Sequence, residues 1–252
     1  MEKLRKPFQG VVNIVRFNWH FYVGVLLFCI ILFLLKNHLP IHLNFILSFV
    51  LLSAITVTFI TLTVSYYVYD LSGLYKLNWL PNNNEKLSIV NINAGFDETS
   101  VLLNIKYPNN NLTVLDFYDP QKHTEISIKR ARKAYPSYPN TINTETTNLP
   151  IKTHSVDKVC VIFSAHEIRN KSERIQFFNE LKRIITTNGE IYVTEHLRDI
   201  PNFLAYNIGF LHFLSLSSWY NVFKAANLTI NNEQKLNPFI TNFTLTKYGD
   251  TA

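Results

Sequence analysis

The chain has 252 residues, of which 47% are hydrophobic and 17% are charged, and its formal net charge is +6. Lysine and arginine outnumber aspartate and glutamate by six to two in residues 1–80, but only by 18 to 16 in residues 81–252. Because the basic surplus lies near the N-terminus, it indicates membrane topology and argues against nucleic-acid binding. The two cysteines, Cys29 and Cys160, form neither a disulfide framework nor a metal-binding spacing, and both are expected as buried thiols in a reducing compartment.

Two long uncharged runs predict a membrane hairpin near the N-terminus. The first, residues 17–35, begins with the interfacial aromatics Trp19 and Tyr22 and would span about 29 Å as a helix. The second extends over residues 43–67. The alternatives are a signal peptide and a buried core hairpin, but no small-residue cleavage site follows the first run and neither run has a polar face.

The charges beside these runs predict their orientation. The basic residues that precede the first run are Lys3, Arg5, Lys6 and Arg16, whereas the break between the runs contains only Lys36. By the positive-inside rule, the N-terminus and the C-terminal domain are both cytoplasmic, and the chain is expected in the cell inner membrane with two spanning helices.

Residues 70–80 connect the second run to the rest of the chain. Their leucines recur at near-helical spacing, with Tyr75 and Trp79 beside them. An amphipathic segment at the inner interface would show this pattern, but so would a linker packed on the domain, and the sequence leaves both open. Pro81, followed by three asparagines, marks the expected boundary between the membrane segment, residues 1–80, and a globular domain, residues 81–252.

From residue 87 onward, apolar strands are expected to alternate with helices. The expected strands are residues 87–92, 112–117, 141–145, 156–163 and 191–194. The expected helices are residues 99–105, 125–134, 172–185 and 219–226, and Gly189 is expected to end the third of them. Residues 228–234 and 241–247 can pair as a closing antiparallel hairpin. This order predicts an α/β fold with a doubly wound, mostly parallel sheet that binds ligands at the carboxyl ends of its strands.

Residues 87–99 combine the first strand, a tight turn and a helix N-terminus. The turn is Asn93-Ala94-Gly95, and Asp97 or Thr99 is expected to cap the helix that follows. A strand, a glycine turn and a helix N-terminus together form a corner suited to binding a nucleotide.

The order of motifs in residues 87–247 resembles class I S-adenosylmethionine (SAM)-dependent methyltransferases, of the type 11-like group that includes quinone and small-lipid methyltransferases. Gly95 matches the central glycine of the family's first motif, whereas Asn91 stands where an acid is usual and Asn93 where a glycine is usual. The resemblance implies a Rossmann-like sheet after the two transmembrane helices, with SAM as the cofactor.

The resemblance also implies which residues bind the cofactor. Asp116, at the end of the second strand, would accept hydrogen bonds from both ribose hydroxyls. Glu145 begins a segment that matches the family's acid-x-x-x-Leu-Pro pattern and would accept a hydrogen bond from the adenine amino group, with Thr146 sharing the task. The full set of expected cofactor-binding residues is Asn91, Asn93, Ala94, Gly95, Asp116, Phe117, Glu145, Thr146 and Ser164.

The polar loop after the fourth strand supplies two candidate catalytic residues, because loops at strand ends carry function more often than other loops. His166 and Glu167 are expected to orient a substrate or to remove a proton from its oxygen or nitrogen atom. The alternative is that His166 packs against the cofactor and that Glu167 pairs with Arg169.

The fifth strand ends in Glu195-His196, as in the family's signature, and His196 is the third candidate catalytic residue, on the rim that opens toward the substrate. The spacing of His166, Glu195 and His196 is not specific for a metal, and methyl transfer by direct displacement requires none. No metal is therefore expected.

Residues 202–216 are almost uncharged and rich in aromatic side chains. This stretch is expected to lie on the membrane or to line an apolar substrate mouth, although a buried core helix would have the same composition.

Together these features predict a membrane-anchored SAM-dependent methyltransferase that acts on a hydrophobic or lipid-like small molecule, with the oligomeric state left open. The alternative, favoured by Asn91 and Asn93, is a methyltransferase-like module that has lost catalysis and serves membrane-tethered binding or assembly. A nicotinamide-dependent dehydrogenase is discounted because the G-x-G-x-x-G motif is absent.

Overall fold

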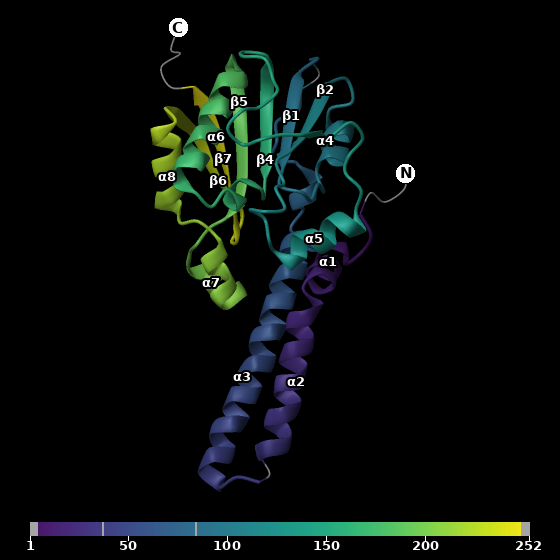
Figure 1. The fold of residues 1–252 in the computed structure, drawn as a ribbon, viewed down its shortest axis with the longest axis vertical. Helices are drawn as coiled ribbons and strands as arrows, with labels where there is room; N and C mark the ends of the chain where they lie inside the picture. The colour runs from purple at the N-terminus through teal and green to yellow at the C-terminus, as the bar shows by residue number, and fades with distance from the viewer. Residues whose placement is uncertain (1–4, 37, 84, 248–252) are drawn as a thin grey trace.

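The computed structural model describes residues 5–36, 38–83 and 85–247 of the chain. Figure 1 shows a sheet flanked by helices at one end of a long two-helix hairpin. The hairpin consists of α2 (Trp19–Lys36) and α3 (Ile41–Tyr66), and a shorter helix, α1 (Gln9–Phe17), precedes it. After α3 the chain passes through a π-helical turn, η1 (Tyr67–Leu71), and a 3-10 turn, η2 (Leu74–Lys76), before it enters the sheet.

One sheet contains the seven strands found in the described part of the chain. They are β1 (Ser88–Asn93), β2 (Asn111–Asp116), β3 (Ile142–Asn143), β4 (Val156–Ile162), β5 (Ile185–His196), β6 (Leu228–Asn237) and β7 (Ile240–Lys247). Their order is β3-β2-β1-β4-β5-β7-β6. The pairs among β1 to β5 are parallel, whereas β7 is antiparallel to both β5 and β6. The predicted α/β fold, a mostly parallel sheet with a closing antiparallel hairpin, is therefore confirmed.

Short helices connect the strands. They are α4 (Ser100–Lys106), α5 (Ile126–Ala134), α6 (Lys171–Ile184), α7 (Ile200–Tyr206) and α8 (Leu216–Ala225), with the 3-10 turns η3 (Ala165–Glu167) and η4 (Asn207–His212). At the start of α4, one carboxylate oxygen of Asp97 accepts hydrogen bonds from the backbone N–H groups of Thr99 and Ser100, both at 2.9 Å. Of the two residues predicted to cap this helix, Thr99 stands at the N-cap position without a side-chain cap, and the Asp97 side chain makes the capping hydrogen bonds.

The predicted helix end at Gly189 is wrong. Helix α6 ends at Ile184, and β5 begins directly at Ile185, where an isoleucine followed by two threonines favours extended backbone. Gly189 lies inside β5, where a Cβ atom would come within 2.9 Å of the Val156 carbonyl oxygen. Ile185 and Thr186 of β5 itself would lie at the same distance, so glycine is needed here because both β4 and the start of β5 approach closely, and it does not end a helix.

Aromatic rings form much of the core on one face of the sheet. Phe178 of α6 packs against Phe223 and Trp219 of α8, with ring centroids 5.1 Å and 6.2 Å away, and all three side chains are buried. Both cysteines are free thiols, of which Cys160 in β4 is buried and Cys29 on α2 is half-buried. The expectation of buried thiols therefore holds fully only for Cys160.

The linker after α3 packs on the other face of the sheet. Leu74, Leu77 and Leu80 are buried, and the last two share a core with Tyr107, beside α4, and Tyr192 of β5. The sequence predicts residues 70–80 either as an amphipathic segment at the membrane interface or as a linker packed on the domain. These three leucines pack on the domain. The domain boundary at residue 80 stays a prediction, since the linker and the sheet share this core.

Helices α2 and α3 are long and apolar enough to cross a membrane, judged by length and composition alone. Their large apolar side chains, such as Phe28, Phe49 and Phe59, are exposed on the outside of the hairpin. The two predicted runs correspond to these helices, except that the first run is interrupted at Asn18, before which residues 9–17 form the separate helix α1. An exposed apolar surface of this size suits contact with lipid or with another apolar surface.

Helix α1 is fixed to the turn that joins the hairpin to the sheet. The carboxylate of Asp70 in η1 accepts hydrogen bonds from the backbone N–H groups of Gly10 and Val11, at 2.8 and 2.9 Å. These N–H groups have no partner within their own helix, and a negative charge is favourable at a helix N-terminus. Asp70 therefore holds α1 against η1.

Replacing Gly10 with alanine is expected to destabilise the chain by roughly 1–3 kcal/mol, as overpacking typically does. The added Cβ atom would overlap the Tyr69 side chain and lie 2.9 Å from the Asp70 carboxylate. Thermal unfolding of the detergent-solubilised chain, followed by circular dichroism, measures the loss. Gly24→Ala in α2 is the matched control, because a Cβ atom there meets nothing within 4 Å. Equal melting temperatures for the two variants would contradict the close packing of α1.

Candidate active site

The carboxyl ends of the parallel strands are turned toward the N-terminal helices. The Tyr69 hydroxyl of η1 lies 2.8 Å from Nε2 of His196, at the end of β5. The Phe17 ring of α1 meets Phe96, just after β1, with centroids 5.5 Å apart. Figure 1 shows α1, α5 and α7 where the hairpin meets the sheet. The edge at which an α/β sheet binds ligands therefore faces the hairpin.

An asparagine builds the glycine turn after β1. Gly95 has a φ of +99°, a conformation that favours glycine. Oδ1 of Asn93 accepts a hydrogen bond from the Gly95 N–H at 3.0 Å, and its Nδ2 donates to the Leu115 carbonyl of β2 at 3.2 Å. Ala94 is buried between them in the chain. The Asn93 side chain therefore fills the inside of the turn, at the position where the sequence motif usually has a glycine.

Asn91 and Ser164 hold strand ends in place. Nδ2 of Asn91 donates to the hydroxyls of Thr99 and Ser100 at the start of α4, at 3.0 and 2.8 Å. The Ser164 hydroxyl donates to the Ile92 carbonyl, at 2.8 Å. These hydrogen bonds engage the Ser164 hydroxyl and Nδ2 of Asn91, whereas Oδ1 of Asn91 is buried without a hydrogen-bond partner among the described residues. The roles of both side chains in cofactor binding stay predictions.

Asp116 lies at the end of β2, where the ribose acid is expected, and only 2% of it is exposed. One carboxylate oxygen accepts from the Tyr118 N–H at 2.9 Å, and the other accepts from Nη1 of Arg132 in α5 at 2.5 Å. The Arg132 guanidinium lies over the Tyr118 ring, 4.3 Å from its centroid. A Cβ atom on Gly95 would lie 3.0 Å from Arg132 Nη1. The Asp116 carboxylate beside the glycine turn is thus already paired with an arginine side chain.

A cavity of about 870 Å³, the strand-end cavity, lies beside the carboxyl ends of β2, β3 and β4. Phe117, Glu145 and Thr146 line it, so three of the expected cofactor-binding residues lie together. Glu145 is exposed, and the Thr146 hydroxyl donates to Glu173 at 2.6 Å. The volume is in the range of known ligand pockets, roughly 300–1,000 Å³.

A smaller cavity of about 140 Å³, the glycine-turn cavity, adjoins the end of β1. Asn93 and Ala94 line it from the turn, and Phe163 and Glu167 line it from the segment after β4. Glu167 also lines the strand-end cavity. Its carboxylate therefore lies where the two spaces approach each other.

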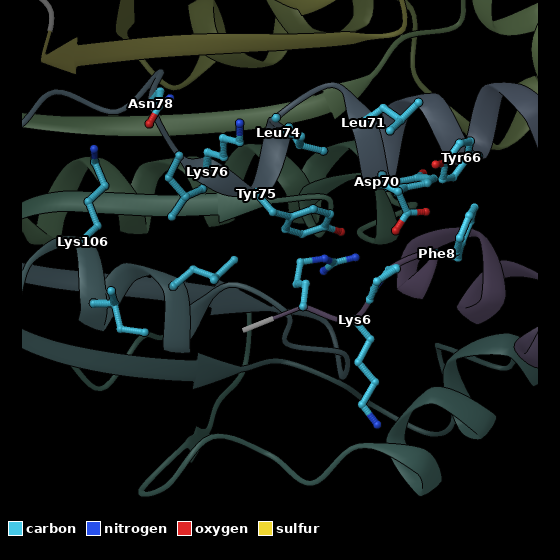
Figure 2. A pocket seen from close by; sticks show the side chains of 17 residues that line it. Lys6, Phe8, Tyr66, Asp70, Leu71, Leu74, Tyr75, Lys76, Asn78 and Lys106 are labelled. Atoms are coloured by element: carbon cyan, nitrogen blue, oxygen red, sulfur yellow. The ribbon is translucent and has the colours of Figure 1, made fainter. Parts of the chain in front are cut away.

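A third cavity of about 790 Å³, the linker cavity, lies between the start of the chain, η1, η2 and α4. Figure 2 shows Lys6, Tyr75 and Lys106 among the side chains around it. Tyr75 lines both the linker cavity and the glycine-turn cavity. The Arg5 guanidinium lies 3.6 Å from the Tyr75 ring centroid, and the Tyr75 hydroxyl donates to Glu98 at 2.7 Å. Tyr75 is therefore a fixed wall between the two cavities.

Five side chains form an acid–histidine cluster after β4: Glu125, His166, Glu167, Glu195 and His212. Nδ1 of His166 lies 2.6 Å from Glu195, and its Nε2 lies 3.2 Å from Glu167. His212 lies 3.3 Å from Glu167 through Nε2 and 3.2 Å from Glu125 through Nδ1. The structure thus brings the candidate residues His166 and Glu167 together with Glu195 and with two residues from distant segments.

The neighbouring charges set the protonation of this cluster. Burial of His166 disfavours its charged form, but the charge of Glu195 and the hydrogen bonds with Glu167 and Glu195 outweigh it and raise the pKa of His166 to about 10. Burial acts to raise the pKa of Glu167, but hydrogen bonds with His166 and His212 outweigh that effect and lower it. With these pKa values His166 holds a proton at neutral pH, and Glu167 is the ionised group that reaches the cavities.

His196 lies in a separate, aromatic environment. Its Nδ1 donates to Asn202 Oδ1 at 2.9 Å, and its ring stacks on Phe163 and Phe213, with centroids 5.4 and 4.7 Å away. Burial lowers its pKa to about 4, so the ring is neutral. Both ring nitrogens are engaged, since Nε2 faces Tyr69. His196 therefore ties β5 to η1 and α7, and its catalytic role stays a prediction.

The apolar stretch of residues 202–216 exposes several of its large apolar side chains. It forms the end of α7 and the turn η4, where Leu204 and Ile208 are 63% and 82% exposed. The nearby apolar side chains Ile200, Phe203 and Leu211 are exposed as well. The stretch is therefore not a buried core helix, and it presents an apolar patch.

Sequence reasoning missed three residues of this region: Glu125, Arg132 and His212. His212 is a polar residue within an apolar stretch, which is a usable signal, whereas Arg132 is one of several basic residues in α5 and gave none. The alternative pairing of Glu167 with Arg169 is present, but at 3.7 Å.

The residues at the strand ends offer the groups that SAM would need, but Asp116 lines none of the three cavities described above, and Gly95 lines instead a small one of about 50 Å³. Asp116 offers a buried carboxylate at the ribose position, and Gly95 supplies a turn in which a side chain would collide with Tyr118 and Arg132. Glu145 lies beside a cavity of suitable size. Because Arg132 already binds Asp116, a ribose would have to share the carboxylate with this guanidinium or displace it.

No protein-family model matches the chain, and no curated protein sequence matches it. Among solved structures, it is similar to a SAM-dependent methyltransferase from Aquifex aeolicus, with a TM-score of 0.50 and 12% identity over 70% of this chain and 93% of that one. It is also similar to an O-methyltransferase family 2 protein from Planctomyces limnophilus in complex with apigenin, with a TM-score of 0.52 and 10% identity over 76% of this chain and 61% of that one.

A third similar structure is an O-methyltransferase from neocarzinostatin biosynthesis, in complex with S-adenosylhomocysteine and 1,4-dihydroxy-2-naphthoic acid. The TM-score is 0.51, with 14% identity over 76% of this chain and 58% of that one. At such identities the likeness concerns the fold alone. The chain therefore has the fold of SAM-dependent methyltransferases, preceded by two long apolar helices.

Proposed function

We propose that the protein is a membrane-anchored SAM-dependent methyltransferase that methylates a hydrophobic or lipid-like small molecule. The observation that carries this proposal is the direction of the sheet: the strand ends lie at the edge of the sheet that contacts α1 and η1, at the base of the apolar hairpin. Asp116, Gly95 and the strand-end cavity lie along this edge. A cofactor bound at this edge would lie next to the surface of a membrane, where apolar acceptors concentrate.

The cofactor roles follow the positions of the side chains. Asp116 is proposed to hold the ribose, Glu145 and Thr146 the adenine, and the Gly95 turn the methionine part. When bound, SAM supplies an electrophilic methyl group on its sulfonium. The protein then has mainly to align the acceptor atom with this methyl group.

A hydroxyl or amine acceptor loses a proton as it gains a methyl group. Glu167 is the ionised side chain that lines both the strand-end and glycine-turn cavities, and it is proposed to orient the acceptor by accepting a hydrogen bond from its hydroxyl or amine. Because its pKa is lowered, Glu167 is a weak base, and the proton is proposed to pass on to solvent. His166 already holds a proton between Glu167 and Glu195, so its proposed task is to fix the Glu167 carboxylate. For His196 we propose a positioning role, through Tyr69 and Asn202.

The exposed apolar surfaces are the basis for proposing a membrane anchor and an apolar acceptor. The Thr61 hydroxyl of α3 donates to the Ala205 carbonyl of α7 at 2.8 Å, so the exposed patch of Leu204 and Ile208 lies beside the hairpin (Figure 1). Such a patch suits the membrane interface. The basic residues before α2 favour a cytoplasmic catalytic domain on the cell inner membrane.

A second candidate function is a membrane-tethered binding or assembly module that has lost catalysis. Two observations favour it: Arg132 is bound to the Asp116 carboxylate, and the Asn93 side chain fills the glycine turn. Both would weaken cofactor binding without disturbing the fold.

Calorimetry with SAM separates the two candidates. The full chain in lipid nanodiscs is expected to bind one SAM, and S-adenosylhomocysteine should compete. Methyl-labelled SAM is then expected to label a component of a lipid extract, whose mass identifies the acceptor. Binding without any labelling would support the second candidate, and no binding would refute the enzyme.

Alkaline carbonate washing of membranes that contain the chain tests the anchor. The chain should stay in the membrane pellet, and its release into the supernatant would refute the anchor.

A further inference from the structure

We infer that His166, Glu167 and His212 form a binding site for one divalent transition-metal ion. One ligand atom from each of the three side chains can be chosen so that all lie within 4.8 Å of one another. The Glu167 carboxylate oxygen Oε1 is 3.2 Å from Nε2 of His166 and 3.3 Å from Nε2 of His212. Ligand atoms at about 2.1 Å from a shared ion stand roughly 3–3.5 Å apart, so these spacings suit coordination.

The donor set selects the class of ion. Two imidazole nitrogens and a carboxylate oxygen suit Zn²⁺, Mn²⁺, Fe²⁺ or Co²⁺, whereas Mg²⁺ and Ca²⁺ prefer oxygen ligands alone. Glu125 lies 3.2 Å from His212 and is exposed, so it can approach as a further ligand. Glu167 lines the strand-end cavity, which leaves the site open to a small molecule on that side.

A buried carboxylate orients the first of these histidines. Glu195 is fully buried, and its two oxygens accept hydrogen bonds from the backbone N–H of His166 at 3.2 Å and from Nδ1 at 2.6 Å. Nε2 is therefore left to face Glu167 and His212. Metal-binding histidines are commonly held in this way, with the second ring N–H donated to a carboxylate. This contact is independent of the convergence of the three ligand atoms.

The carboxylates of the cluster outnumber its guanidinium, which favours a cation. Glu125, Glu167 and Glu195 carry three negative charges, and the nearest guanidinium is that of Arg169. Its Nη2 lies 3.6 Å from Glu125 and 3.7 Å from Glu167, and it also lies 2.5 and 2.6 Å from the two ring nitrogens of His212. A metal ion that binds His212 would therefore have to displace this guanidinium. Binding of the ion would release the proton from His166. The three carboxylates and the Arg169 guanidinium then leave two excess negative charges, which a divalent ion balances. In the absence of an ion, a proton on His166 compensates for part of this charge.

An ion in this place would lie beside the proposed site of methyl transfer, because Glu167 also lines the glycine-turn cavity. A hydroxyl oxygen bound to the ion loses its proton more readily. This assistance rests on the proposed function, whereas binding of the ion does not.

Cobalt titration tests the site directly. The full chain in detergent is stripped with a chelator, and Co²⁺ is added while visible absorption is recorded. We expect one Co²⁺ per chain with the d–d bands of a nitrogen–oxygen site, and displacement of Co²⁺ by Zn²⁺. Absence of stoichiometric binding by the wild-type chain would overturn the inference, whatever the variants do.

Variants assign the binding to these residues. His212→Gln and Glu167→Gln are each expected to weaken Co²⁺ binding at least tenfold, and Glu195→Gln, which removes a positioning residue, by roughly 10–100-fold. His42→Gln, on the exposed start of α3, is the matched control and should bind as the wild type does. Circular dichroism identifies variants that have not folded.

Two results separate this inference from the proposed function. Wild-type Co²⁺ affinity in folded His212→Gln and Glu167→Gln chains would overturn the metal site. The titration contains neither SAM nor an acceptor, so its failure leaves the methyltransferase proposal standing. Conversely, a chain that binds Co²⁺ but not SAM would refute only the enzyme.

Discussion

Asp116→Ala is expected to weaken SAM binding by about 100-fold. Each hydrogen bond from a ribose hydroxyl to an ionised carboxylate contributes roughly 1.5–3 kcal/mol, and about 1.4 kcal/mol corresponds to a factor of ten in affinity. Asp116 is buried at the end of β2, so solvent cannot replace its carboxylate within the site. Isothermal titration of the full chain in nanodiscs measures the change.

Two further variants sharpen this test. Asp157→Ala makes the same change at the opposite end of the sheet, where Asp157 accepts from the Ser88 N–H at 2.9 Å, and should leave SAM affinity unchanged. Arg132→Gln should tighten binding, because the ribose then no longer shares Asp116 with a guanidinium. Unchanged affinity in Asp116→Ala would contradict the ribose role. Loss of binding in Arg132→Gln would mean that the arginine itself holds the cofactor.

Glu195→Ala is expected to lower the free energy of unfolding by about 3 kcal/mol or more, the range seen when one partner of a buried ion pair is removed. Both carboxylate oxygens bind His166, and the side chain is fully buried at the end of β5. Its removal leaves the buried imidazole with Glu167 as its remaining acidic partner and opens space in the core. Thermal unfolding of the solubilised chain measures the loss.

Glu173→Ala is the control for this prediction. Glu173 pairs with Lys122 at 2.9 Å near the surface, and its side chain is 22% exposed. Pairs of this kind contribute no more than about 1 kcal/mol. A similar loss in the two variants would show that the Glu195–His166 contact has no special weight in the fold.

The elements of the sheet could be predicted because each strand leaves a local signal. The run expected as a strand at residues 156–163 is apolar and β-branched, and it forms β4 (Val156–Ile162). The strand expected at residues 191–194 is longer in the structure, where β5 begins at Ile185. The mistake at Gly189 has a physical reason. A glycine after an amphipathic helix usually ends that helix, but here it makes room for the neighbouring strand β4. That contact joins segments far apart in the sequence.

A site residue could be predicted only where its position along a strand determines where it lies in the fold. Asp116 and Glu167 follow strand ends, and the fold brings them to the same edge. Arg132 reaches Asp116 from α5, and His212 reaches Glu167 from η4. The sequence contains no pattern that links these pairs, because their distances depend on how helices pack on the sheet. The same holds for α1, whose docking depends on Asp70 in a segment beyond both hairpin helices.

The order in which the ribosome makes these parts adds a constraint on assembly. Val68 and Leu74, just after α3, pack in one cluster with Ile240 of β7, the last strand of the chain. The hairpin is thus synthesised long before the strand against which its end rests. Such a distant contact is slow to form, and the incomplete sheet exposes strand edges meanwhile. Closure of β7 between β5 and β6 is therefore expected to be the late step that locks the sheet onto a hairpin already in place.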